Sequence, residues 1–144
     1  MIMNHIDKNV IKLKHYERIY YEYTDCTEFV YHTNYLKFME RARTEWLNSL
    51  GFSQRRLKQT HKVFFVVKSA KINYIKPARL DDYLVLNINR LQFKKASLTV
   101  FQEISLENQH KICEGEFLLA CVSSISFAPT KIPETIIEVI KNVS

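Results

Sequence analysis

The fold is decided by the stretch Tyr31-His32-Thr33-Asn34-Tyr35-Leu36-Lys37-Phe38-Met39-Glu40-Arg41-Ala42-Arg43-Thr44-Glu45-Trp46. Its apolar residues recur at steps of three and four, which is the period of a helix that buries one face. They are Tyr35, Phe38, Met39, Ala42 and Trp46, and Leu50 continues the series. The pattern predicts a helix over residues 33–50. Thr33 or Asn34 is expected to cap its first turn, and Gly51 to end it.

Outside this helix the hydrophobic period is two, which predicts strands. The predicted strands cover residues 16–23, 63–75, 83–91, 95–107 and 112–127, and a short helix follows over 133–143. Gly115 in the last strand is expected to mark a bulge. Because the connections are short, consecutive strands are antiparallel, and the long helix must cover one face of their sheet. The prediction is an α+β fold with an antiparallel sheet of about five strands around one long central helix.

The edges of such a sheet are expected to determine how the chain assembles. A long edge strand exposes unpaired backbone groups, which favours pairing with a second copy of the chain. We therefore expect a homodimer with a continuous sheet, or a homotetramer formed by two such dimers.

The composition excludes several kinds of site. Two glycines are too few for a glycine-rich phosphate loop. The three cysteines, Cys26, Cys113 and Cys121, are odd in number and widely spaced, so we expect reduced thiols and neither a disulfide framework nor a zinc site. The five histidines show no metal-binding spacing, and no metal is expected.

Length, hydropathy and charge indicate the number of domains, the cellular compartment and the partners of the chain. The 144 residues suit one domain over 1–144. Residues 1–14 contain no apolar segment long enough for a secretory signal, and no run approaches a membrane span, so we expect a cytoplasmic protein without a transmembrane segment. The net charge is +6, but the basic residues are scattered, and nucleic acid is not expected as a partner.

An acid and a histidine stand at the start of the long helix. Asp25 lies where the first predicted strand gives way to a turn, and His32 follows seven residues later. The first N–H groups of a helix have no intrahelical partner and favour negative charge nearby. A carboxylate facing them can cleave an activated acyl bond, either as a general base on water or as a nucleophile, while the N–H groups stabilise the oxyanion. By position alone, an Asp at a strand end is more often a turn or capping residue.

Three segments of the chain carry a resemblance to a known family. The matching residues are Tyr20, Tyr21, Glu22, Thr24, Asp25, Val30, Tyr31, His32, Asn34, Tyr35, Leu36, Phe38, Glu40, Arg41, Ala42, Arg43, Thr44 and Glu45, followed by Pro77-Ala78-Arg79-Leu80-Asp81-Asp82. This sequence pattern resembles that of the YbgC-type, 4-hydroxybenzoyl-CoA thioesterase-like acyl-CoA thioesterases. The likeness covers residues 16–130, which we take as the core of the domain.

The resemblance implies a fold, a reaction and roles for residues. The fold would be the hotdog fold, and the reaction the hydrolysis of an acyl-CoA or acyl carrier protein thioester to a free acid and a thiol. The family's catalytic acid falls on Asp25, its active-site histidine on His32, and Tyr31 is expected among the substrate-binding residues. No cofactor is implied, because coenzyme A is part of the substrate. Acyl carrier protein and proteins of envelope or lipid synthesis are the further partners to consider.

The loop before Val30 departs from the family pattern. Relatives carry glycine just before the Val-Tyr-His segment, whereas this chain has Thr27 and Glu28. Glycine is used where φ is positive or where a ligand approaches the backbone closely. Glu28 is therefore expected to strain the loop or obstruct the acyl channel, with altered acyl preference or lost activity as the consequence.

Other charged residues are weaker candidates. Glu40 is the reserve catalytic acid, although the charged cluster around it on the helix is by default a solvated face or a set of intra-helix ion pairs. Lys94, Lys95 and Ser97 lie at a predicted hairpin and are either a solvated turn or the contacts for the phosphates of coenzyme A. Arg79 is a further phosphate candidate.

Two other functions stay open at this point. A non-catalytic acyl-CoA-binding or scaffolding module would account for the unusual loop at Thr27 and Glu28. A hotdog hydratase or dehydratase typically has its Asp four residues before its His, whereas Asp25 and His32 are seven apart.

Overall fold

The computed structural model describes all residues except 1–3, 8–13, 108–109 and 144. Its elements are β1 (Asn4–Asp7), β2 (Lys14–Arg18), the 3-10 helix η1 (Tyr21–Tyr23), α1 (Thr33–Ser49), α2 (Gln54–Arg56), the π-helix η2 (Leu57–His61), β3 (Val63–Tyr74), β4 (Tyr83–Phe93), β5 (Ser97–Leu106), β6 (Lys111–Ser123) and α3 (Glu134–Val143).

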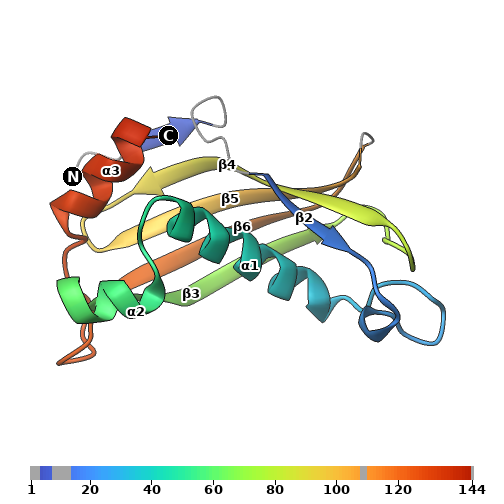
Figure 1. Ribbon diagram of the computed structural model, residues 1–144, viewed down its shortest axis with the longest axis horizontal. Helices are drawn as coiled ribbons and strands as arrows, with labels where there is room; N and C mark the ends of the chain where they lie inside the picture. Colours follow the sequence, from blue (N-terminus) through green and yellow to red (C-terminus); the bar gives the residue numbers. More distant parts are fainter. Residues whose placement is uncertain (1–3, 8–13, 108–109, 144) are drawn as a thin grey trace.

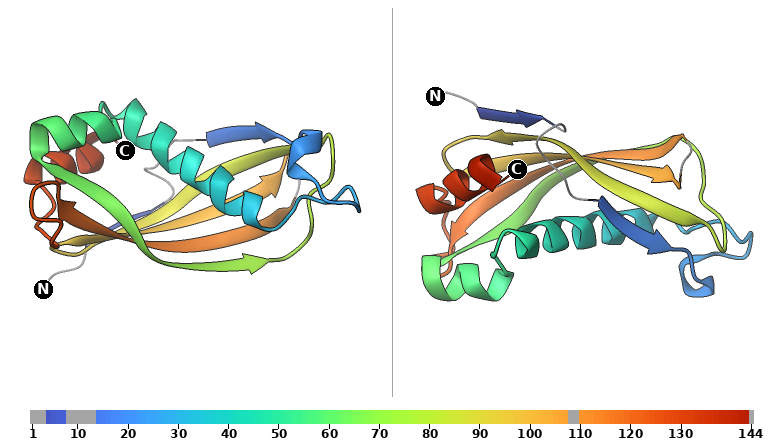
Figure 2. Two further views of the ribbon diagram at one scale, coloured as in Figure 1. Left: turned by 90° about the horizontal axis from the view of Figure 1, so that it is seen from below. Right: turned by 45° about the horizontal axis from the view of Figure 1, so that its top comes forward.

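The strands form one antiparallel sheet in the order β1-β4-β5-β6-β3, with β2 also paired to β4. β1 and β2 share one edge, because β1 pairs with residues 90–93 of β4 and β2 with residues 83–87. β3 forms the other edge, and α1 lies across one face of the curved sheet (Figures 1 and 2). The predicted α+β class with an antiparallel sheet and a long covering helix is confirmed.

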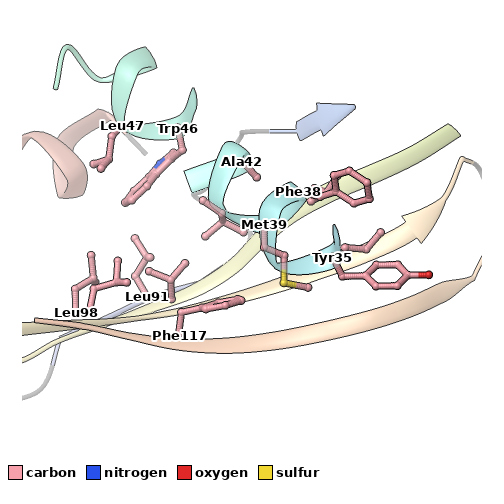
Figure 3. Packing of buried hydrophobic residues seen from close by; sticks show 14 of the residues in the cluster. Tyr35, Phe38, Met39, Ala42, Trp46, Leu47, Leu91, Leu98 and Phe117 are labelled. Carbon is pink, nitrogen blue, oxygen red and sulfur yellow. The ribbon is translucent and has the colours of Figure 1, made fainter. Parts of the chain in front are cut away.

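The core lies between α1 and the sheet. The helix contributes Phe38, Met39, Ala42 and Trp46, which pack towards Phe117 and neighbouring side chains of the strands (Figure 3). All five side chains are almost fully buried, and the burial of the four on α1 is the result expected from their helical spacing. Burial of this apolar stripe fixes the position of α1, and with it the position of the helix N-terminus.

Gly115 does not mark a bulge, which corrects the sequence prediction. It pairs regularly with Ile72, and the interruptions in the register lie elsewhere. A Cβ atom at this position would lie 2.8 Å from Sδ of Met39 and 2.7 Å from Cε2 of Phe117. Glycine is needed here because the helix side chain approaches the strand too closely for any other residue.

Two predicted strand ends differ from the structure, and the predicted helix end agrees with it. The strand predicted over 16–23 ends at Arg18, and η1 follows, because the N–H groups of Tyr23 and Thr24 bond back to Tyr20 and Tyr21. The last long strand ends at Ser123, so residues 124–127 form a turn. The predicted end of α1 at Gly51 is confirmed by a φ of 91°.

The predicted side-chain cap of α1 is wrong. His32 occupies the cap position and makes no side-chain capping bond. The Asn34 amide turns away from the helix end and donates to the carbonyl of Tyr23 at 3.0 Å. The N–H groups at the start of α1 are consequently not covered by either of the predicted caps.

The helices among the described residues include α1, which is the longest at 17 residues. None of them is long and apolar enough to cross a membrane.

Candidate active site

The loop that carries Asp25 is a tight hairpin. Thr24 pairs with Val30, and the N–H of Asp25 donates to the carbonyl of Phe29 at 3.0 Å. The N–H of Glu28 donates to the carbonyl of Asp25 at 3.2 Å, and Glu28 has a φ of 69°. A turn followed by a left-handed residue is a common three-residue hairpin loop, and glycine adopts that conformation with least strain. Glu28 therefore occupies a position that favours glycine.

The carboxylate of Asp25 is exposed and held by Thr27. Its Oδ1 accepts hydrogen bonds from the hydroxyl of Thr27 and, at 2.8 Å, from the N–H of the same residue. Both bonds favour the charged form, so the hydroxyl first and the N–H second lower the pKa of Asp25 below its ordinary value. Oδ2 accepts no hydrogen bond from the residues that the structure describes. Asp25 is thus an ionised acid with one oxygen free to react.

The N-terminus of α1 presents free backbone donors. His32 is exposed and has helical dihedral angles, with φ −57° and ψ −30°. Within the described part of the chain, the N–H groups of His32 and Thr33 have no hydrogen-bond partner. No acidic residue lies in the first turn. These donors and the helix dipole can therefore stabilise a negatively charged oxygen.

Aromatic residues surround His32. The ring of Tyr31 lies 4.6 Å from the imidazole, and the ring of Tyr74 stands edge-on to it at 6.2 Å. The hydroxyl of Tyr74 donates to the carbonyl of His32 at 3.2 Å. The end of β3 thereby holds the start of α1, while the His32 side chain stays exposed.

Asp25 and His32 are not in contact. The hairpin pair Asp25–Phe29 lies two residues beyond the pair Tyr23–Tyr31, which corresponds to about 7 Å along extended chain. No hydrogen bond between Asp25 and His32 occurs among the described residues. The two predicted catalytic residues therefore belong to one hairpin-helix unit, and a reacting group would have to lie between them.

The segment that follows β3 braces this unit. The carbonyl of Ala78 accepts from the N–H of Val30 at 2.9 Å, and the N–H of Leu80 donates to the carbonyl of Glu28 at 3.1 Å. The hydroxyl of Tyr35, on α1, accepts from the N–H of Ala78 at 3.0 Å. Burial raises the pKa of Tyr35, so the hydroxyl stays protonated. Sequence reasoning missed this anchor, although a buried tyrosine generally needs a polar partner.

Glu40, the reserve acid, lies away from the helix mouth. It is eight residues beyond His32, or about 12 Å along a helix. Its Oε1 accepts from the hydroxyl of Thr44 at 2.8 Å. Glu40 lines a groove of about 460 Å³ between α1 and β3, with Val67 and Ala70 on the strand side. The structure therefore does not bring Glu40 to Asp25.

Arg43 corrects the expectation of a fully solvated charged face. Only 8% of the residue is exposed, and its Nη1 donates to Oε1 of Gln102 at 2.9 Å. Gln102 in turn donates to the carbonyl of Met39 at 3.0 Å, and the guanidinium lies 4.3 Å from the centre of the Phe117 ring. Burial lowers the pKa of Arg43 to about 10. No charge pattern in the sequence distinguishes this arginine from Arg41, which is half-buried and pairs with Glu17.

The predicted phosphate contacts lie far from the helix mouth. Lys94 and Lys95 are exposed in the hairpin between β4 and β5, and Ser97 pairs with Ala120 of β6. Tyr74, which holds His32, pairs with Cys113 of the same strand. The seven residue steps from Cys113 to Ala120 span about 23 Å, so the hairpin and the helix mouth are at opposite ends of the sheet (Figure 1).

Arg79 lies at the site hairpin instead. Its guanidinium stacks 4.9 Å from the centre of the Phe29 ring, next to the turn that carries Asp25. It is exposed, and it is the one predicted phosphate candidate that the chain folds close to Asp25.

Comparisons with known proteins identify the family of the chain. The family model of the thioesterase superfamily matches residues 27–113. The acyl-CoA thioester hydrolase YbgC of Escherichia coli O6:H1 is 38% identical over 120 residues, which cover 83% of this chain and 89% of that protein. The acyl-CoA thioesterase YbgC of Helicobacter pylori strain J99 is 34% identical over 134 residues, which cover 88% and 98%.

Solved structures share the fold. A hypothetical protein from Aquifex aeolicus superposes with a TM-score of 0.81 at 24% identity, covering 89% of this chain and 98% of that one. The DHNA-CoA thioesterase of Staphylococcus aureus gives 0.78 at 20% identity, covering 90% and 89%. The predicted hotdog fold is thereby confirmed. The family model and the YbgC relatives together show that the chain belongs to the thioesterase superfamily, among its YbgC-type members.

Proposed function

We propose that this thioesterase hydrolyses acyl-CoA to a free acid and coenzyme A, with the carboxylate of Asp25 as general base or nucleophile. The observation that carries the proposal is the ionised carboxylate of Asp25, with one oxygen free, on the same hairpin-helix unit as the unpaired N–H groups of His32 and Thr33. The names of the YbgC relatives support acyl-CoA as the substrate.

The chemistry follows from the charges that develop in the reaction. The thioester carbonyl binds between the hairpin and the first turn of α1, where the N–H groups of His32 and Thr33 donate to its oxygen. Each such donor lowers the barrier by about 3–4 kcal/mol when the oxygen becomes an anion. Asp25 either takes the proton of an attacking water or attacks the carbonyl itself.

The leaving group needs little help. A thiol has a pKa of about 8.5, so the thiolate departs without a strong general acid. This explains how one carboxylate and two backbone donors suffice. The exposed imidazole of His32 lies beside the donors and is placed to orient the water or the acyl group. Tyr31, packed against that ring, contributes to the wall of the acyl site.

The test is thiol release from a panel of acyl-CoA substrates. Wild type is expected to release thiol, and Asp25→Asn to lose at least about 100-fold in kcat/KM. Asp81→Asn removes another exposed carboxylate and serves as the matched control. Activity of wild type should fall only below the ordinary pKa of an aspartate, because the bonds from Thr27 lower the pKa of Asp25. Equal rates for Asp25→Asn and wild type would contradict the proposal.

The non-catalytic alternative has one observation in its favour. Glu28 adopts a left-handed conformation where glycine is favoured, and its side chain is exposed beside Asp25. If the chain only binds acyl-CoA, calorimetry will detect tight binding while the thiol assay detects no turnover. The same assay with acyl carrier protein thioesters decides which thiol carrier is used.

We propose that the working form is a homodimer joined through β3, either alone or as half of a tetramer. β3 is an edge strand, and Val67 is 53% exposed at its centre. The groove between β3 and α1 has an apolar floor that a second copy can cover. Antiparallel pairing of two β3 edges also brings the 94–97 hairpin end of one subunit towards the helix mouth of the other.

We place the protein in the cytoplasm. Cys26, Cys113 and Cys121 are all free, which suits a reducing compartment. Burial raises the pKa of Cys113 to about 12, so this thiol is packed and unreactive.

A further inference from the structure

Tyr23 connects the hairpin that carries Asp25 to α1. It is the last residue of η1 and stands two residues before Asp25. Three residues of α1 contact it, namely Asn34, Phe38 and Arg41. Their spacing of four and three residues places them on one face of the helix. Because each of them contacts a different part of Tyr23, this residue is held along two turns of α1.

Asn34 binds the backbone of Tyr23. Only 8% of Asn34 is exposed, and its Nδ2 donates to the Tyr23 carbonyl at 3.0 Å. The same carbonyl accepts from the N–H of Tyr31 at 2.9 Å, across the hairpin. One oxygen is therefore bonded both to the returning strand of the hairpin and to the first turn of α1. The hairpin cannot swing about the segment between Tyr31 and α1 unless the bond from Asn34 breaks.

Phe38 and Arg41 bind the side chain of Tyr23. The rings of Tyr23 and Phe38 stand edge-on to each other at a centroid distance of 5.0 Å. Nη1 of Arg41 donates to the Tyr23 hydroxyl at 3.3 Å and to Oε1 of Glu17 at 3.4 Å. Glu17 belongs to β2, which passes beside α1 (Figure 1). The side chain of Tyr23 is thus held by α1 and, through Arg41, by β2.

Asp25 has no such tie of its own to α1. The two hydrogen bonds to its carboxylate both come from Thr27, within the same turn. Among the described residues, no hydrogen bond joins residues 24–29 to α1. The backbone bonds of Glu28 and Val30 fasten the hairpin to residues 78–80 instead. On the side of α1, the position of Asp25 therefore depends on Tyr23.

The proposed reaction requires a fixed distance between the hairpin and the helix. The thioester carbon must lie within reach of Asp25 while its oxygen meets the N–H groups at the start of α1. Misplacement of a reacting group by about 1 Å can cost about 100-fold in rate. Because an exposed loop moves more than a packed helix, a residue that ties this loop to α1 controls the rate.

We propose that Tyr23 is a positioning residue for the hydrolysis and that Asn34 and Arg41 hold it in place. These three residues, here called the Tyr23 clamp, fix the carboxylate of Asp25 at its distance from the N–H groups of α1. They act through Asp25, to which none of them is bonded. This inference rests on the proposed hydrolysis. Loss of the clamp should lower kcat and leave KM unchanged, because the contacts that bind the acyl-CoA remain.

The first test is the steady-state kinetics of two variants. Asn34→Ala removes the bond from α1 to the Tyr23 carbonyl and should lower kcat for an acyl-CoA by about 10- to 100-fold. Tyr23→Phe keeps the ring on Phe38 and removes only the bond from Arg41, so a smaller loss of about threefold is expected. KM should stay within about twofold in both variants. Tyr21→Phe is the control, because it removes a hydroxyl from a residue of η1 that is 76% exposed, and it should change neither constant.

The second test follows the hairpin itself. Cys26 is exposed in this hairpin, whereas Cys113 and Cys121 are buried, so a nitroxide reagent labels the hairpin selectively. Asn34→Ala should increase the mobility of the label in its electron paramagnetic resonance spectrum, and Tyr21→Phe should not. Urea unfolding shows that each variant is folded at the assay temperature. If Asn34→Ala does not fold, the same two measurements are made on Tyr23→Phe.

Other outcomes overturn the proposal. A higher KM with an unchanged kcat assigns the clamp residues to substrate binding. A fall in kcat without a change in label mobility shows that the clamp does not hold the hairpin. An unchanged kcat in both variants shows that Asp25 needs no such support. If Asp25→Asn releases thiol as fast as wild type, the proposed hydrolysis itself fails, which is a distinct result, since the label still reports whether the clamp holds the hairpin.

Discussion

At the scale of the residue, Thr27 and Glu28 have opposite effects on the loop that carries Asp25: Thr27 stabilises the charged carboxylate, whereas Glu28 strains the backbone. Thr27 donates twice to Asp25 and keeps it ionised. Glu28 closes the loop with a left-handed backbone that an ordinary side chain adopts only at a cost. The bonds from Thr27 to Asp25 are local to the turn and do not involve the Glu28 side chain. The bonds that favour the charged carboxylate of Asp25 are therefore retained although the loop lacks glycine.

Replacing Glu28 by glycine should stabilise the protein. The left-handed backbone costs about 1–2 kcal/mol for a residue with a Cβ, and glycine removes this cost. Part of the gain is lost again, because glycine raises the conformational entropy of the unfolded chain. We expect a net gain of about 0.5–1 kcal/mol, seen as a higher midpoint of urea unfolding with an unchanged slope.

The control places glycine where the backbone does not need it. Glu22→Gly lies in η1, also on the surface, and should lower the midpoint. A Glu28→Gly variant that unfolds at lower urea than wild type would show that the Glu28 side chain stabilises the loop by contacts stronger than its backbone strain.

At the scale of the element, the position of α1 depends on one strand residue without a side chain. Met39 of α1 fills the space above Gly115, and Phe117 fills the space beside it. Met39 lies six residues after Thr33 on the same helix, so a shift of α1 at Gly115 would also move the N–H groups of His32 and Thr33.

Gly115→Ala should lower the free energy of unfolding by about 1–3 kcal/mol, because its Cβ would overlap Met39 and Phe117. The same change in a Met39→Ala background should cost less, since the sulfur that it meets is gone. Gly51→Ala is the control: no atom lies within 4 Å of its Cβ position, and its cost comes from a φ of 91° alone. That cost should be the same in both backgrounds. Equal costs of Gly115→Ala in the two backgrounds would rule out contact with Met39.

The elements also show what sequence periodicity could predict. Steps of three and four located α1 to within a residue at its end, because a buried helical face imposes that spacing. The aromatic run before Asp25 predicts a strand that continues to Tyr23. The Tyr23 ring instead packs edge-on against Phe38 at a centroid distance of 5.0 Å. Long-range packing of this kind is invisible to a local pattern. The burial of Arg43 on Gln102, 59 residues away, escaped prediction for the same reason.

At the scale of the whole molecule, the residues suited to binding acyl-CoA are divided between the two ends of one sheet. The helix mouth is near Tyr74, while the 94–97 hairpin is at the opposite end of the sheet. In the proposed dimer, antiparallel pairing of the β3 edges would join these ends between two copies. On this view the chain depends on its dimer for substrate affinity as well as for burial of apolar surface.

A charge at the centre of β3 should therefore remove both dimer and activity. Val67 is exposed, and two-fold symmetry would set the lysines of a Val67→Lys variant near one another, where like charges repel. Wild type should sediment at twice 17.1 kDa or a multiple of it, and Val67→Lys at 17.1 kDa with thioester hydrolysis largely lost. Tyr16→Lys puts the same charge on β2, at the opposite edge, and should change neither quantity. A monomeric Val67→Lys variant with full kcat/KM on acyl-CoA would show that each chain holds a complete site.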